Sequence, residues 1–79
     1  MPMALIKSFE QKSMDRNSIH DGIGATYSTF ERDGRRFIQV DSYGRAGREI
    51  PGKKSQSFQL DEKSARELFE ILRDTFQFH

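Results

Sequence analysis

The chain has no cysteine and no tryptophan, and only two prolines among its 79 residues. Without cysteine it cannot form a disulfide, a thiolate metal site or a thiol nucleophile. No apolar run approaches the roughly 18 residues that a membrane-spanning helix requires. Residues 1–6 also lack the charged start and the long apolar stretch of a signal peptide. These absences predict a cytoplasmic protein without a membrane partner.

The chain has few side chains with which to build a hydrophobic core. Leu, Ile, Val and Phe supply 18 of the 79 residues, just above the roughly one-fifth below which disorder becomes the default expectation. Domains this short often need a metal, a disulfide or a second subunit for stability. Because cysteine is absent, the composition favours a single domain over 1–79 that associates with a second copy of itself.

Charge is nearly balanced over the whole chain but not along it. The formal net charge is +1, yet residues 32–54 hold seven basic and three acidic side chains. A basic segment within a neutral chain favours a local anionic partner. An ordinary pair of solvated loops is the alternative. The basic residues are Arg32, Arg35, Arg36, Arg45, Arg48, Lys53 and Lys54.

Asp33-Gly34 lies between two segments rich in β-branched and aromatic residues. This dipeptide is the strongest short signal for a β-hairpin, because glycine tolerates the positive φ of the tight turn. In the second segment Ile38 and Val40 alternate with aromatic and polar residues, as expected for a strand with two different faces. We expect strands at 4–10, 25–32, 36–43 and 55–60, with loops at 11–24 and 44–54.

A single helix is predicted over 62–76. Asp61 precedes it, and an aspartate carboxylate can accept hydrogen bonds from the free amides of a first helical turn. Most apolar residues of this segment form one stripe, whereas Ile71 and Phe78 lie off it and indicate a second buried surface. The stripe consists of Ala65, Leu68, Phe69, Leu72 and Phe76. The order of elements predicts an α+β fold, in which a four-stranded antiparallel meander sheet is covered by one C-terminal helix.

Motifs for catalysis or cofactor binding fail at identifiable positions. Residues 47–54 have the glycine and lysine spacing of a phosphate-binding P-loop. However, Lys54 stands where Ser or Thr would hold magnesium, and a strand is expected where a helix should follow. The two histidines, His20 and His79, are far apart in the sequence. We therefore expect no catalytic residues, no metal site and no cofactor.

The strand over 36–43 has an unusual second face. Phe37, Gln39, Asp41 and Tyr43 lie opposite its aliphatic residues. Aromatic side chains on an open sheet can stack on unpaired bases, while nearby Arg and Lys side chains meet the phosphates. The alternative is that Phe37 packs at a sheet edge or in a dimer contact, with Tyr43 half exposed.

Residues 38–72 resemble a known family. Their motifs are Ile38-x-Val40-x-x-Tyr43, a glycine-rich loop, Pro51-Gly52-Lys53-Lys54, a strand ending at Leu60, and a helix with Ala65 and Leu68. This order resembles the C-terminal domain of the transcriptional coactivator called positive cofactor four and its bacterial and phage relatives. The resemblance implies a homodimer formed through the helices that binds single-stranded DNA across its sheets. It also implies that Lys53, Lys54 and Tyr43 contact nucleic acid.

These observations predict a small dimeric protein, cytoplasmic or nucleoid-associated, that binds single-stranded DNA or RNA with little sequence preference. A protein-interaction module on the same scaffold is the alternative, because Asp41 lies within the stacking face and the net charge is small. The expected dimer contacts are Leu68, Ile71 and Leu72. The expected nucleic-acid contacts are Arg35, Arg36, Phe37, Tyr43, Arg45, Lys53 and Lys54.

Overall fold

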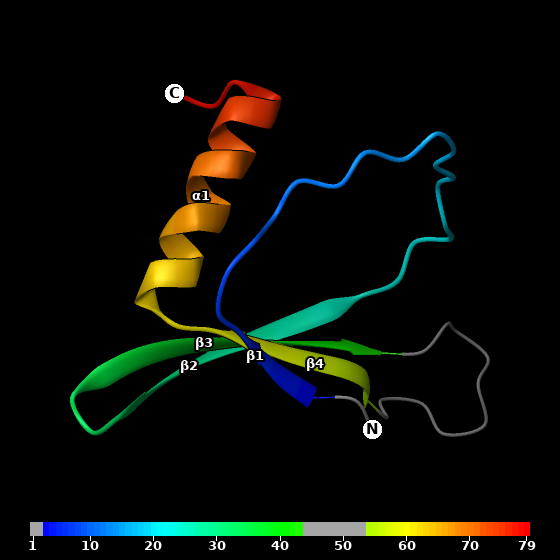
Figure 1. Ribbon diagram of the computed structural model, residues 1–79. Coiled ribbons are helices and arrows are strands. Elements are labelled where there is room, and N and C mark those ends of the chain that lie inside the picture. The colour runs from blue at the N-terminus through cyan, green and yellow to red at the C-terminus, as the bar shows by residue number, and fades with distance from the viewer. Residues whose placement is uncertain (1–2, 44–53) are drawn as a thin grey trace.

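The computed structural model describes residues 3–43 and 54–79, with the side chains of residues 54 and 55 left undescribed. It has an α+β fold, in which a four-stranded sheet is followed by one C-terminal helix (Figure 1). The predicted fold class is confirmed at this level. The elements are β1 (Met3–Ile6), β2 (Ala25–Arg32), β3 (Arg35–Tyr43), β4 (Lys54–Leu60) and α1 (Glu62–Phe76).

The β2–β3 hairpin forms where the sequence predicts it. Asp33 and Gly34 both adopt positive φ, at 55° and 76°, as a two-residue turn of the type favoured in hairpins requires. The antiparallel pairing runs without interruption from Arg32–Arg35 to Ala25–Ser42. The turn thereby sets which side chains of the two strands lie opposite each other.

The predicted meander is wrong at its first strand. β1 ends at Ile6 rather than at residue 10, and it pairs in parallel with β4, so the sheet is mixed and its order is β1-β4-β3-β2. β2, at the other edge, runs in the same direction as β1 and β4. The chain must therefore cross back over the sheet between β1 and β2, and residues 7–24 are long enough for such a crossover. The pairing places Ala4 beside Phe58 and Ile6 beside Leu60, which extends the aliphatic face of β4.

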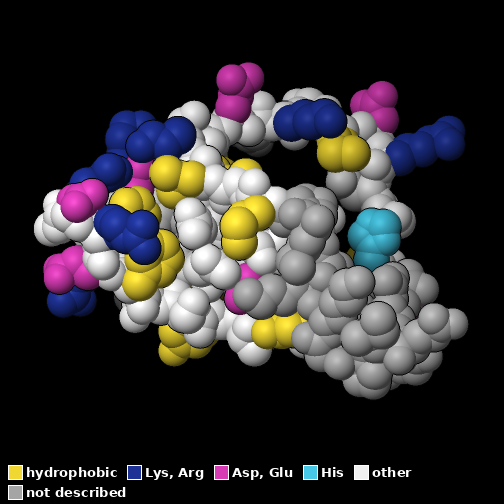
Figure 2. Space-filling view, turned by 90° about the horizontal axis from the view of Figure 1, so that it is seen from below, with side chains coloured by type: hydrophobic (Ala, Val, Ile, Leu, Met, Phe, Trp, Pro, Cys, Tyr) yellow, Lys and Arg dark blue, Asp and Glu magenta, His cyan; other side chains and the backbone are white. Residues whose placement is uncertain are grey.

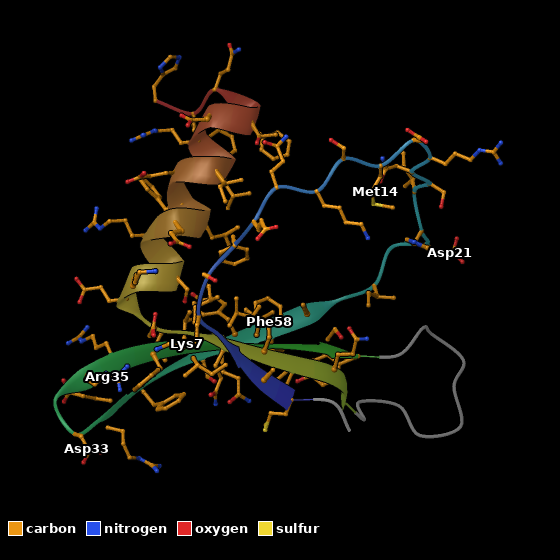
Figure 3. All side chains as sticks on the ribbon, viewed as in Figure 1. Lys7, Met14, Asp21, Asp33, Arg35 and Phe58 are labelled. Atoms are coloured by element: carbon orange, nitrogen blue, oxygen red, sulfur yellow. The ribbon has the colours of Figure 1, made fainter. Side chains whose placement is uncertain are left out.

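The two faces of the sheet differ in character. Cross-strand register places Ile38 opposite Leu60 and Val40 opposite Phe58. Phe58 lies on the side of the sheet from which the helix rises (Figure 3). Because side chains alternate along a strand, the odd-numbered residues of β3 and β4 lie on the other side. The helix therefore stands over the aliphatic face and leaves the second face open.

The helix is anchored at its beginning. Asp61 forms a capping box with Ser64, in which the Ser64 N–H donates to Asp61 Oδ1 at 3.0 Å and the Asp61 N–H donates to Ser64 Oγ at 3.1 Å. The segment after β1 runs beside the helix (Figure 1). There Lys7 Nζ donates to Asp61 Oδ2 at 2.6 Å, and the Phe9 N–H donates to Glu67 Oε1 at 3.1 Å. These contacts hold only the first half of α1.

The core is very small. Among the described residues Leu60 is the one buried apolar side chain, with 5% of its surface exposed. The radius of gyration is 14.8 Å, against roughly 12 Å for a compact domain of this length. Farther along the helix, apolar side chains face solvent, with Phe69 58% and Phe76 62% exposed. A single chain thus leaves a large part of its apolar surface uncovered.

Candidate nucleic-acid interface

An aromatic pair lies on the open face of the sheet. Phe30 of β2 and Phe37 of β3 are paired by the hairpin register, and their rings stack with centroids 5.2 Å apart and planes 17° from parallel. The Arg35 guanidinium carbon lies 5.1 Å from the centroid of the Phe37 ring, within the range of a cation–π contact. The site therefore combines stacking surface with a positive charge at its border.

A chain of polar side chains lies next to this pair on the same face. Gln59 Nε2 donates to Gln39 Oε1 at 3.0 Å, and Gln39 Nε2 donates to Asp41 Oδ1 at 2.9 Å. The Ser57 hydroxyl donates to the same Asp41 oxygen. Asp41 is only 6% exposed. Its carboxyl group is thus little exposed and hydrogen-bonded to Gln39 and Ser57.

The aromatic pair and the two glutamines line one shallow depression of about 470 Å³. Figure 2, seen from below, shows this side of the molecule, with apolar side chains over the sheet and Lys and Arg side chains gathered towards the hairpin end. Leu5 of β1 forms one wall, and Arg32 lies at the hairpin end. The full lining is Leu5, Phe30, Arg32, Phe37, Gln39 and Gln59.

A charged cluster joins this face to the helix. Asp61 Oδ2 lies 2.6 Å from Lys7 Nζ and 3.7 Å from Arg35 Nη2. The hydrogen bonds from the Lys7 side chain and the Ser64 N–H hold the pKa of the Asp61 carboxyl well below its usual range. Arg35 thus has one anionic neighbour and one aromatic neighbour, which together orient its guanidinium at the edge of the site.

The structure brings together some of the predicted nucleic-acid contacts and separates others. Arg35, Phe37 and Tyr43 share the open face, and the Tyr43 hydroxyl is bound to Thr26 Oγ1 at 2.8 Å. Strand alternation places Arg36 on the opposite face, with Glu31 as its neighbour in the backbone register.

The remaining predicted contacts lie in or next to the undescribed segment. Arg45 and Lys53 are outside the described residues. Lys54 begins β4 and pairs with Tyr43 in the backbone register, but its side chain is also outside the description.

Sequence reasoning missed Phe30, Gln59 and Leu5 as parts of this surface. Phe30 could have been found, because a two-residue turn at Asp33-Gly34 places it directly opposite Phe37. Gln59 and Leu5 could not, because their positions depend on which strands lie beside β3 and β4. That order is a property of the whole sheet.

The predicted dimer contacts differ in their surroundings. Leu68 and Ile71 line a groove of about 450 Å³ with Phe9 and Gln11 of the segment that runs beside the helix. Leu72 is 40% exposed, and it belongs to the stripe with Phe69 and Phe76. These two phenylalanines were absent from the predicted contacts, although the helical spacing places them beside Leu72.

Comparisons with protein-family models, with curated proteins and with solved structures found no match to this chain. Within residues 3–43 and 54–79, no helix combines the length and the apolarity needed to cross a membrane. The same part of the chain contains no group of three or more His, Asp or Glu side chains placed to hold a metal ion. The open sheet face is therefore interpreted from its own chemistry.

Proposed function

We propose that this protein binds single-stranded nucleic acid on the open face of its sheet. The observation that supports this best is the stacked pair Phe30–Phe37 with the Arg35 guanidinium against it. Each base stacked on an aromatic side chain contributes about 1–3 kcal/mol to binding of single strands. Because both faces of each base in a duplex are covered by the neighbouring base pairs, such stacking favours unpaired bases over a duplex.

The surroundings of the pair suit an extended anionic strand. Arg32 and Arg35 lie at the hairpin end of the site, and the sequence has four further basic residues between positions 45 and 54. The one acidic residue on this part of β3, Asp41, is buried and hydrogen-bonded to Ser57 and Gln39. Its presence among the predicted stacking residues is therefore no obstacle to a bound strand.

The exposed stripe on the helix supports pairing with a second copy of the chain. The Phe69, Leu72 and Phe76 stripe is exposed, and fully burying one such side chain contributes about 1.5–3 kcal/mol. With Leu60 as the single buried apolar residue among those described, an isolated chain has little else to offset its conformational entropy. Pairing of two helices through this stripe gives a dimer in which the open sheet face of each protomer remains uncovered.

Fluorescence anisotropy with a labelled single strand and its matching duplex tests the proposal. We expect tighter binding to the single strand, and a steep loss of affinity with added salt because each neutralised phosphate releases counterions. Equal binding to both forms would contradict the stacking mechanism. No binding to the single strand at low salt would refute the proposed function.

A protein-binding module is the second candidate, favoured by the same exposed helix stripe. The two candidates differ in what that stripe does when the protein is alone in solution. If the protein sediments as a dimer, the second copy covers the stripe and the sheet face remains as the ligand surface. Sedimentation as a folded monomer without affinity for nucleic acid would favour a helix that binds another protein.

A further inference from the structure

The glutamine chain on the open face has a fixed direction. Asp41 Oδ1 accepts from the Ser57 hydroxyl and from Gln39, which turns its amino group towards this oxygen. Gln39 then presents its carbonyl oxygen to Gln59, which must donate in turn. A side-chain amide on a surface can normally rotate to exchange its donor and acceptor. Here the buried carboxylate determines the orientation of both amides.

The last amide in this chain keeps unused hydrogen-bonding groups. Gln59 donates one N–H to Gln39 and retains its second N–H and its carbonyl oxygen, and neither has a partner among the described residues. Gln59 lies between Gln39 and Leu5 in the sheet register. Its free amide edge therefore borders the depression that the aromatic pair also lines.

The aromatic pair and the glutamines of the depression are separated by about the width of one base. Phe37 and Gln39 are two positions apart on β3 and point to the same side, which separates them by about 7 Å along the strand. A base stacked on the aromatic pair thus reaches the glutamine row with its edge. Arg32 lies at the opposite end of the same depression, beyond Phe30, where it can meet the phosphate of that nucleotide.

On the basis of the proposed function, we infer that this depression is a base-reading subsite whose preferred occupant is adenine, with Gln59 as the specificity-determining residue. Adenine presents an amino donor beside an unprotonated ring nitrogen, the pattern that a glutamine amide pairs with through two hydrogen bonds. Cytosine presents the same pattern with a smaller ring to stack. In the same orientation, guanine and thymine place a carbonyl acceptor against the oxygen of the fixed amide; the contact of Arg32 with the phosphate holds the nucleotide in that orientation.

Binding of dA, dC and dT homopolymers of equal length to the full chain tests this subsite. We expect the wild-type protein to bind dA about tenfold more tightly than dT, in the range of one two-bond base contact. In Gln59→Met, which keeps the side-chain length, dA affinity should fall to that for dT while dT affinity is unchanged. Gln56→Met is the matched control, because Gln56 is exposed on the same strand and on the opposite face.

The outcomes separate this inference from the function on which it rests. If no homopolymer binds, the proposed function fails and the subsite with it. If all three bind equally to the wild-type protein, or if an adenine preference survives Gln59→Met, single-strand binding stands and the subsite is refuted. A preference for another base that disappears in Gln59→Met would refute adenine as the occupant.

A further variant tests how the amide is oriented. Asp41→Asn preserves shape but adds a donor, so the direction of the glutamine chain is no longer imposed. With an unchanged Tm as evidence of folding, this variant should lose most of the adenine preference. Full retention of the preference would refute the role of Asp41.

Discussion

Two aromatic surfaces of this protein are incompletely covered, and their surroundings differ. On the sheet, Phe30 and Phe37 are half-buried, stacked on each other and bordered by Arg35 and a hydrogen-bonded glutamine. On the helix, Phe69 and Phe76 are largely exposed, the Arg73 guanidinium carbon lies 5.7 Å from the centroid of the Phe69 ring, and Phe76 stacks on Phe78. What distinguishes the sheet pair is the row of hydrogen-bonded amides beside it, which suits a ligand that is itself partly polar. The more exposed rings of the helix suit another apolar surface.

The same difference appears in how each surface is held. The sheet face is organised by side-chain hydrogen bonds between neighbouring strands, so it keeps its shape without a covering layer. The helix is tied to the sheet by Lys7–Asp61 and by the Phe9 amide at Glu67, both near its beginning. Its second half lacks such contacts within the described residues. Cross-strand hydrogen bonds therefore accompany the proposed ligand surface, and incomplete burial accompanies the proposed dimer surface.

The largest effect is expected from Phe69→Lys on the helix stripe. If two copies pair there, the change removes about 1.5–3 kcal/mol of burial from each protomer and adds a charge to an apolar contact. Sedimentation velocity should show loss of the dimer, and thermal unfolding should show a marked fall in Tm. Glu70→Lys places a lysine at the next, exposed position, with a change of two charge units instead of one, and should leave both unchanged. Equal behaviour of the two variants would refute the helix-mediated dimer.

The next largest effect is expected from Phe37→Ala on the sheet. The change removes half of the aromatic pair and the ring that Arg35 contacts, and it should weaken single-strand binding by about 1–3 kcal/mol, measured by anisotropy at fixed salt. Tyr27→Ala is the matched control, because Tyr27 is 74% exposed and its register partner Val40 places it on the opposite face. Equal loss in both variants would mean that the open face is not the binding surface.

The smallest effect is expected at the joint between the two surfaces. At this joint the pKa of the Asp61 carboxyl is lowered in the folded protein, which means that folding stabilises the ionised form. This contribution is fully present above the unfolded-state pKa near 3.8 and is lost as the pH falls below it. Denaturant titrations between neutral pH and pH values below 4 should show a smaller decline in stability for Asp61→Asn than for the wild type. An identical decline would exclude Asp61 as a contributor to acid sensitivity.

Local signals in the sequence predicted much of the fold. Asp33-Gly34 predicted the hairpin because its backbone preferences are intrinsic to the two residues. Asp61 and the spacing of the apolar residues that follow predicted the helix at 62–76, as found in Glu62–Phe76. The strand phase that grouped Phe37 with Gln39 and Asp41 is confirmed by the cross-strand contacts. Each of these features depends on residues close together in the chain.

The candidate site was predicted less completely. Arg36 was assigned to the same surface as Phe37 although the two are adjacent, and adjacent residues of a strand point to opposite faces. Gln59 was not recognised, because a lone glutamine in a predicted strand has no signal of its own. Its proposed role depends on Asp41 of the neighbouring strand, which accepts a hydrogen bond from Gln39, which in turn accepts one from Gln59.

By itself, the sequence determined the hairpin, the capped amphipathic helix and the phase of the central strand, because turn geometry, capping and side-chain alternation act over a few residues. Only the tertiary structure decided that β1 lies parallel to β4 at the sheet edge. A short strand has several possible partners, and the choice depends on the crossover formed by residues 7–24. The tertiary structure also decided which polar groups meet around the aromatic pair, because hydrogen bonds between strands depend on the order of the whole sheet.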